Sequence, residues 1–407
     1  MLHTIIIRFS NLFLKGFFVV AVYFIFSGCT GEKKIVANTS ISTLNADIRI
    51  KRIMKAGETH LYNIYLKAGE FFHAQVNQYD IDVVVKVAAT NGQPEQVFDM
   101  PTGELDAENI YLHSESDWKY DIEISTAQKY PDPGEYDINI VRLGKATDDD
   151  KKWMNALAAT QKADRMRDPE TRAQSIAQYE TALTLWKELK DDLQYAKALR
   201  SLGFVNAREK NYDKASQIFN QLIPKWKQLG ETRSEGYSFL VLGWINNTQK
   251  DYKKSLENNL KSIDYWVRTK DIDQESFTLM NIGTLYAKLD EKQKAIDYFE
   301  QALKKSGHSK RPSVKALILR EYAYAILPKG ENEKAVELYK QSLKQWLLTI
   351  NSPEEARTAV LLATHFAEKN DKQQAIQYYE QVLAIWQKLG EQKEIDAVRA
   401  SLDKVKK

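Results

Sequence analysis

Tryptophan recurs along this chain with a period of 40 residues. Five of its eight tryptophans lie on one grid, and Ser306 occupies the remaining grid position: the five are Trp186, Trp226, Trp266, Trp346 and Trp386. A fixed period of this length indicates a repeat architecture in which each repeat packs on its neighbours. We therefore expect the grid residues to pack between helices; a ladder of ligand-binding tryptophans is the alternative.

Three further columns share the 40-residue register. The first holds Gly203, Gly243, Gly283, Ala323 and Ala363; the second holds Ser175, Ala215, Ser255, Ala295, Ala335 and Ala375; the third holds Tyr179, Phe219, Asn259, Phe299, Tyr339 and Tyr379. Small residues midway along one helix and at the start of the next allow two helices to approach closely. An aromatic residue four positions later fills the same face. Each repeat is therefore predicted to be a pair of helices.

Turn signals such as Lys210-Asn211 and Leu229-Gly230 separate the predicted helices. They divide the chain into six pairs, at residues 151–189, 191–230, 231–270, 271–308, 309–350 and 351–390. A last helix at 391–407, rich in lysine and glutamate, is expected to cap the open end of the stack.

This pattern resembles the tetratricopeptide repeat, which has small residues at its eighth and twentieth positions and an aromatic residue at its twenty-fourth. The usual repeat has 34 residues, so each unit here carries about six more, which we assign to longer helices. The resemblance implies an all-α superhelical solenoid over residues 151–390 and a protein-binding role.

Residues 46–145 follow a different period. Segments such as 60–66, 120–124 and 136–141 alternate apolar and polar residues, and turn signals lie between them. About eight short strands in this length predict a β-sandwich with a jelly-roll-like arrangement. The whole chain is therefore predicted to be an α+β multidomain protein, with a β-sandwich followed by the solenoid.

The order of motifs in the β-region resembles a known module. Residues 66–70 read Leu-Lys-Ala-Gly-Glu, an Asp-Ile-Asp-Val-Val-Val run follows at 80–85, and a Pro-Gly-Glu-Tyr strand closes the domain at 133–136. These features are similar to the bacterial pre-peptidase C-terminal-like domain. Some bacterial secreted proteins place this module ahead of tetratricopeptide repeats and end in a caspase-like CHAT peptidase domain. The chain resembles the non-catalytic part of such proteins.

The single cysteine, Cys29, follows a basic start and a short apolar run, Gly16 to Phe26. This arrangement is typical of a secretory signal at residues 1–28. The Ser27-Gly28-Cys29 ending looks like a bacterial lipobox, although Phe26 stands where leucine is usual. We expect acylation of Cys29, a tether over 29–45 and a lipid anchor on a bacterial membrane facing the periplasm or exterior. Ordinary cleavage and an uncleaved anchor are the alternatives.

Composition and motifs give no indication of catalysis. The formal net charge is +3, with acids and bases interleaved, so no nucleic-acid partner is indicated. A caspase-like site needs a cysteine beside a histidine, and the only cysteine lies in the leader.

His60, His73 and His113 could converge on the sandwich surface as a ligand set, although a histidine on a strand is more often simply a polar surface residue. The acidic clusters Asp80 with Asp82 and 148–150 suit turns and helix starts better than calcium. We expect no enzyme activity, cofactor, metal or small-molecule substrate.

The remaining candidate is the groove lined by the first helices. Transferring the tetratricopeptide register predicts these groove residues: Lys197, Arg200, Phe204, Arg208, Tyr237, Leu240, Trp244, Phe277, Met280, Arg320 and Tyr324. The asparagine that some tetratricopeptide domains use to clamp a peptide carboxylate is replaced here, for example by Phe204 and Trp244. An aromatic stripe with scattered arginines favours an extended or helical peptide with apolar anchors. The alternative is that longer helices bury these aromatics between pairs.

Two functions follow from these patterns. The first is a non-enzymatic scaffold, tethered to the extracytoplasmic side of a bacterial membrane, that binds a protein or peptide through the groove. The second is a regulatory or substrate-recruiting subunit for a separate peptidase or other enzyme.

Overall fold

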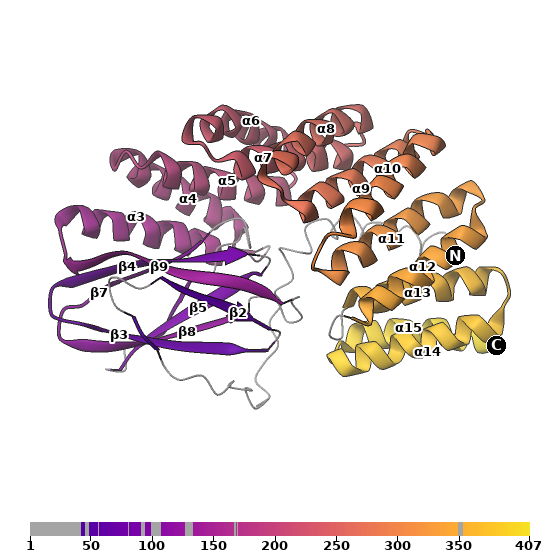
Figure 1. Cartoon of the computed structure of the whole chain (residues 1–407), viewed down its shortest axis with the longest axis horizontal. Coiled ribbons are helices and arrows are strands. Elements are labelled where there is room, and N and C mark those ends of the chain that lie inside the picture. Colours follow the sequence, from indigo (N-terminus) through magenta and orange to yellow (C-terminus); the bar gives the residue numbers. More distant parts are fainter. Residues whose placement is uncertain are drawn as a thin grey trace. The chain divides into compact units, whose positions relative to one another are not determined.

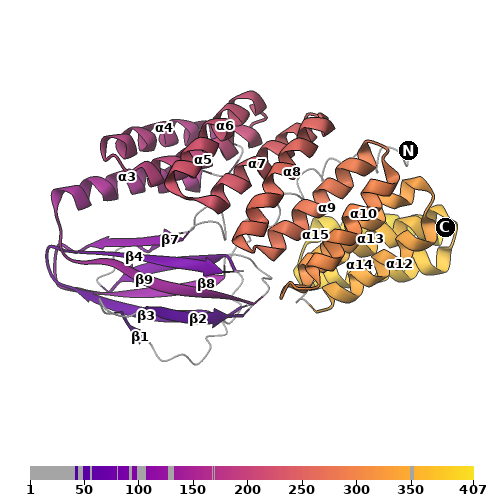
Figure 2. The same cartoon turned by 45° about the horizontal axis from the view of Figure 1, so that its top comes forward.

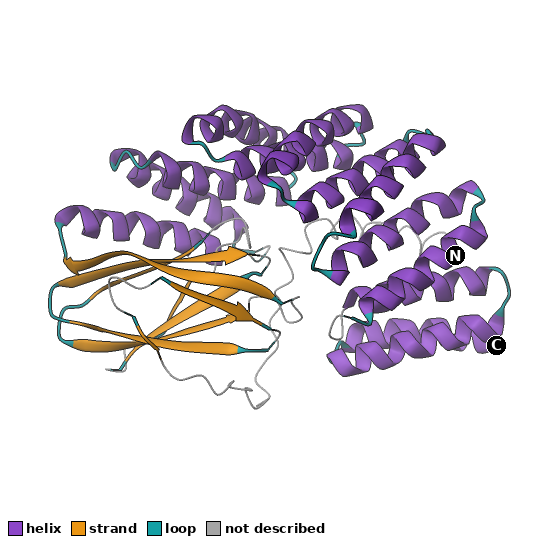
Figure 3. Ribbon diagram, in the orientation of Figure 1, coloured by secondary structure: helices purple, strands orange, loops and turns teal. Residues whose placement is uncertain are grey.

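The computed structural model describes residues 42–44, 49–55, 57–79, 81–90, 94–98, 107–126, 133–166, 168, 170–348 and 353–407. The predicted leader, Cys29 and most of the predicted tether lie outside these residues. Strands come first and helices follow (Figure 3), so the predicted fold class is confirmed. The chain divides into two compact units, Met1–Ser238 and Phe239–Lys407.

The strands of the first unit form two sheets (Figure 1). They are β1 (Ser42–Thr43), β2 (Ile50–Met54), β3 (Thr59–Leu66), β4 (Glu70–Tyr79), β5 (Val83–Ala89), β6 (Gln96–Phe98), β7 (Glu108–His113), β8 (Trp118–Thr126) and β9 (Gly134–Lys145). One sheet has the order β1-β3-β8-β5-β6 and the other β2-β9-β4-β7. The pairs β2–β9 and β3–β8 join strands far apart in sequence, as in a jelly roll.

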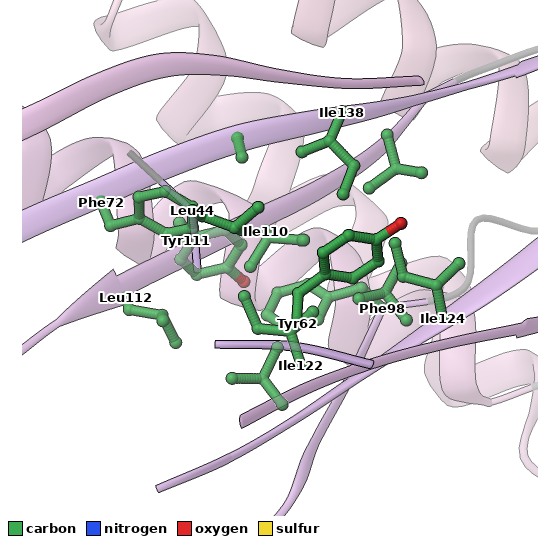
Figure 4. Close-up of a cluster of buried hydrophobic side chains, with 14 of the residues drawn as sticks. Leu44, Tyr62, Phe72, Phe98, Ile110, Tyr111, Leu112, Ile122, Ile124 and Ile138 are labelled. Carbon is green, nitrogen blue, oxygen red and sulfur yellow. The ribbon is translucent and has the colours of Figure 1, made fainter. Parts of the chain in front are cut away.

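Alternation of side chains explains these strands. In β4, Phe72, Ala74 and Val76 are buried, whereas the residues between them are half-buried. The apolar faces of both sheets meet in one core (Figure 4), and the hydroxyl groups of Tyr62 and Tyr136 lie 2.6 Å apart within it. This domain therefore has a continuous interior between its sheets.

The last residues of the predicted tether belong to this domain. Ser42 and Thr43 form β1, parallel to β3, and the Leu44 amide donates to the Asn63 carbonyl over 2.8 Å. Leu44 is buried in the apolar core of the β-domain. The expected tether is thus too long at its C-terminal end.

Thirteen α-helices lie in the described residues, arranged as six pairs followed by α15. They are α3 (Asp148–Arg165), α4 (Arg172–Glu188), α5 (Asp192–Arg208), α6 (Tyr212–Leu229), α7 (Thr232–Thr248), α8 (Tyr252–Thr269), α9 (Ile272–Lys288), α10 (Lys292–Ser306), α11 (Pro312–Ile326), α12 (Asn332–Trp346), α13 (Pro353–Glu368), α14 (Lys372–Leu389) and α15 (Gln392–Lys406).

The small-residue and aromatic columns meet inside the helix pairs. A β-carbon at Gly203 would lie 3.0 Å from Phe219, and one at Gly283 would lie 3.1 Å from Phe299. Both distances are shorter than ordinary carbon contacts, so glycine permits the close approach of the two helices. The tryptophan column is also buried, with exposures between 0% and 5%. These tryptophans serve packing, as the sequence predicted.

The turns repeat every 20 residues as well. Residues 190, 210, 230, 250, 270, 290, 330, 370 and 390 all have positive φ. Only three of these are glycine, and lysine occupies four. Each such residue reverses the chain at a helix end. Aspartates such as Asp251 and Asp271 then cap the next helix by accepting from its third backbone amide.

In the first unit, the sheet that contains β4, β7 and β9 packs on helix α3. Trp153 of α3 lies 4.7 Å from the His73 ring and 5.9 Å from the Tyr111 ring, and Tyr111 Oη donates to Gln161 over 2.9 Å. Both views place α3 along the sheet of β4, β7 and β9 (Figures 1 and 2). Residues of α3, α4 and α5 share the core of the β-domain. The β-domain is therefore held against the first helices.

Residues 148–150 have the predicted helix-start role. The Thr147 side chain accepts from the Asp150 amide, and the Asp150 carboxylate accepts from the Thr147 amide at 2.7 Å. Asp150 also pairs with Arg142 of β9 over 2.8 Å. This reciprocal cap fixes the start of α3 next to the sheet.

Candidate binding face of the first helices

Each first helix has one face on its partner helix and another turned away from it. In α9, Gly283 faces the second helix, whereas Phe277, Asn281, Thr284 and Lys288 recur at spacings of three and four. Side chains at these spacings share one side of the helix. We call the corresponding side of α5, α7, α9, α11 and α13 the first-helix face.

In the first unit, the side chains of this face are partly or fully buried. Arg200 is fully buried and Phe204 is 8% exposed, whereas Lys197, Arg208 and Tyr237 are half-buried. The Phe204 ring lies 5.2 Å from Phe219 and 6.0 Å from Tyr237. Phe204 therefore packs among its neighbours rather than projecting into solvent.

The Arg200 guanidinium group is held inside this packing. It donates to Ser234 Oγ at 3.4 Å, and its Cζ lies 5.5 Å from the Trp226 ring. Burial lowers the pKa of Arg200 to about 10, against the opposing influence of Tyr237 and Glu231. A group so enclosed serves the internal packing of the first unit.

The second unit leaves more of this face accessible. Leu240 and Trp244 of α7 and Phe277 of α9 are half-buried, and Tyr324 of α11 is 39% exposed. Met280 is 1% exposed and Arg320 is 5% exposed. Four of the predicted groove residues in this unit thus present apolar or aromatic surface, and two are enclosed.

A row of polar and charged contacts runs beside these apolar residues. Lys288 of α9 donates to Asn247 Oδ1 of α7 at 2.8 Å. Arg320 of α11 donates to the adjacent Glu321 at 3.2 Å and also pairs with Glu354 of α13. We call this row the ionic ladder; Glu354 extends it to Arg357, one turn further along α13.

The ladder places two carboxylates in contrasting environments. Burial raises the pKa of Glu321, although the Arg320 guanidinium opposes this effect. At Glu354, burial also favours the neutral form, but Arg320 and Arg357 together outweigh it, and the pKa is lowered. Glu354 is therefore the firmly ionised member that holds the two arginines.

The tetratricopeptide register predicted Arg320 but not Lys288, Glu321 or Glu354. Their signal is present in the sequence: Lys288 lies 41 residues after Asn247, and Glu354 lies 34 residues after Arg320. A search for complementary polar residues about one repeat apart would have found both pairs.

The other candidate sites do not assemble. His60 Nδ1 lies 2.7 Å from the Tyr136 hydroxyl group, and His73 Nε2 lies 3.1 Å from Asn109 Oδ1 in the other sheet. Within the described residues, no group of histidine, cysteine and acidic side chains can hold a metal ion. No helix among these residues is both long and apolar enough to span a bilayer. Asp80 lies outside the described residues.

Family comparison supports the repeat assignment. Two tetratricopeptide repeat families match, one over residues 278–304 and the other over residues 315–388. The chain contains tetratricopeptide repeats. Comparison with curated proteins finds no significant match.

Several solved structures are similar to this chain. A putative kinesin light chain with TPR-like repeats from Podosopora anserina is 13% identical, with a TM-score of 0.41, over 47% of this chain and 94% of that one. The apo form of RapI is 14% identical, with a TM-score of 0.47, over 63% and 75%. Aspartyl phosphate phosphatase F from Bacillus subtilis is 14% identical, with a TM-score of 0.43, over 58% and 61%.

Tetratricopeptide repeats form a fold suited to protein interaction, because stacked helix pairs present a long continuous surface. In the second unit, the accessible apolar residues and the ionic ladder lie on the first helices of the pairs.

Proposed function

We propose that this chain is a membrane-tethered scaffold that binds a protein or peptide segment along the first-helix face of its second unit. This proposal rests on one observation: exposed surface remains on this face at Leu240, Trp244, Phe277 and Tyr324. Packing within the helix pairs uses the glycine and aromatic columns instead. Half-exposed aromatic side chains beside fixed polar groups are typical of interfaces between proteins.

The ionic ladder supports a protein partner in a second way. The buried Arg320 holds Glu354, and Glu354 in turn holds Arg357. Glu354 and Arg357 are half-buried, so a partner meets charged groups that are already ordered. Ordered groups lose little conformational entropy on binding, and they penalise partners that leave a charge unpaired. We propose that the apolar residues supply affinity and the ladder supplies selectivity.

The tethered protein is first used to capture its partner from membranes, and the captured partner is then used in a binding assay. We expect Trp244→Ala and Tyr324→Ala each to weaken binding of the captured partner by about tenfold or more, since exposed aromatics dominate such interfaces. Titration of purified partner against each variant measures the dissociation constant. Circular dichroism checks that helical content is retained.

Leu347→Ala is the matched control. Leu347 is 67% exposed and directly follows α12, the second helix of its pair, so it is not part of a first helix. Its replacement removes a comparable apolar side chain and should leave affinity unchanged. If folded Trp244→Ala and Tyr324→Ala variants bind as tightly as the parent protein, the proposed binding face is wrong.

We also propose that acylated Cys29 anchors the scaffold to a bacterial membrane, on the periplasmic or exterior side. The proposal rests on the basic start, short apolar run and small residues before Cys29. Cys29→Ser is expected to move the protein from the membrane fraction to the soluble fraction. Membrane association of the variant equal to that of the parent would contradict the lipid anchor but leave the binding proposal standing.

The β-domain is proposed to share the origin of the pre-peptidase C-terminal-like module that its motifs resemble. Its contacts with α3 support a fixed placement on the first helices, so that the scaffold offers the β-domain and the first repeats as one body.

A further inference from the structure

The helix α8 is packed with polar side chains where the other second helices use apolar ones. Its buried residues are Ser255, Asn259, Ser262 and Trp266. Among the second helices of the described residues, α8 alone has a single apolar side chain in this set. The helix therefore gains less from burial than its neighbours do.

Asn259 stands where the other repeats have an aromatic residue. In the two flanking pairs, Gly203 contacts Phe219 and Gly283 contacts Phe299, but Gly243 contacts the Asn259 side-chain amide. The amide nitrogen donates to the Ser255 carbonyl within the same helix at 2.8 Å. This bond lies within α8. The side-chain hydrogen bonds that join α8 to α7 come from Ser255 Oγ, which donates to the Gly243 carbonyl at 2.7 Å, and from Asn258 Nδ2, which donates to Asn246 Oδ1 at 2.9 Å.

Two buried polar atoms of α8 are left without hydrogen bonds. Asn259 Oδ1 and Trp266 Nε1 find no hydrogen-bond partner among the described residues, although Asn259 is 3% exposed and Trp266 is fully buried. A buried polar atom loses its hydration on folding, so an unpaired one destabilises the folded helix.

The solvent-facing side of α8 also differs from the other second helices, because it carries apolar residues. Leu260 is 41% exposed and Val267 is 53% exposed. The residues at the Leu260 position in the three later pairs are Glu300, Lys340 and Glu380. Two apolar side chains of α8 thus lie in solvent, whereas Ser255, Asn259 and Ser262 lie inside.

We infer that the α7–α8 pair is a built-in weak repeat that opens locally at a lower free energy than the pairs on either side. In a solenoid, each repeat is stabilised by its own packing and by its nearest neighbours, so one poorly packed pair divides the cooperative stack. The chain's two compact units also divide within α7, at Ser238 and Phe239. The weak repeat is a conformational device that lets the flanking helices open independently.

Hydrogen exchange on the full chain tests this inference without any partner. Amides of α8 are expected to exchange about tenfold or more faster than those of α10, because local opening exposes them more often. Asn259→Phe recreates the glycine–phenylalanine pair present twice in this chain and should slow exchange in α8 by about tenfold. Phe299→Asn is the reverse variant and should speed exchange in α10 by a similar factor.

Exchange in α8 as slow as in α10 would overturn the inference, and this measurement on the parent protein requires no variant. Unchanged exchange of α8 in a folded Asn259→Phe protein would also contradict it. Where the larger side chain prevents folding, Asn259→Leu and the Phe299→Asn variant supply the same comparison.

Discussion

Arg320→Met is expected to lower the free energy of unfolding by about 3–5 kcal/mol, as removal of one member of a buried ion network does. Arg320 is 5% exposed and pairs with both Glu321 and Glu354. Methionine has similar length, so the main change is the loss of positive charge between two carboxylates. Urea unfolding followed by circular dichroism measures the difference.

The loss is expected to depend on pH. In the parent protein, the lowered pKa of Glu354 contributes stability that is present above its unfolded pKa and is lost as pH falls through the folded one. Without Arg320, the pKa values of the Glu321 and Glu354 carboxyl groups rise, so these groups take up protons at a higher pH in the variant than in the parent. Protonation removes the negative charge that Arg320 balanced and restores part of the lost stability. The deficit relative to the parent should therefore shrink between about pH 7.5 and about pH 5.

Arg357→Gln provides the control for this network. Arg357 is only half-buried and its side chain pairs with Glu354 one turn away on the same helix. Such pairs contribute up to about 1 kcal/mol, so the control should lose far less stability. An Arg320→Met protein as stable as the parent at neutral pH would show that the ladder does not stabilise the fold.

Trp186→Ala is expected to lower the free energy of unfolding by about 3–5 kcal/mol, the range for deletion of a large buried aromatic side chain. Trp186 is 1% exposed, its ring lies 5.5 Å from Trp153, and its Nε1 donates to Thr160 at 2.9 Å. Trp153 in turn contacts His73 and Tyr111 of the sheet. The cavity therefore lies in the core that α4, α3 and the β-domain share.

Because this core is shared, the variant should lose protection in β4 and α3 together. Hydrogen exchange resolved by segment measures both, and Trp186→Phe is the control, since it keeps an aromatic ring and should lose less stability. Loss of protection in α3 with β4 unchanged would show that the β-domain folds independently of the helices.

The periodic features were predictable because they arise from local spacing. The glycine and aromatic columns meet as predicted in pairs such as Gly203 with Phe219. The tryptophan column is buried, and alternation located strands such as β3 and β8. In each case, side chains a few residues apart share one face of an element, so the pattern reports the packing directly.

The candidate binding face was only partly predictable. The register placed Tyr324 and Trp244 on the first helices, and both keep exposed surface. It also named Arg200 and Met280, which are buried. Register fixes the side of a helix on which a residue lies, but exposure depends on neighbouring helices that lie about 30 to 40 residues away in sequence.

The sequence by itself determined the repeat length, the helix pairs and the change from strands to helices, because these depend on spacing within one or two turns or along a single strand. Only the tertiary structure decided that Leu44 joins the sheet, that α3 closes on the β-domain, and that Arg320 bridges Glu321 and Glu354. The physical reason is that burial and ion pairing depend on which distant segments meet in space, and no local period records those meetings.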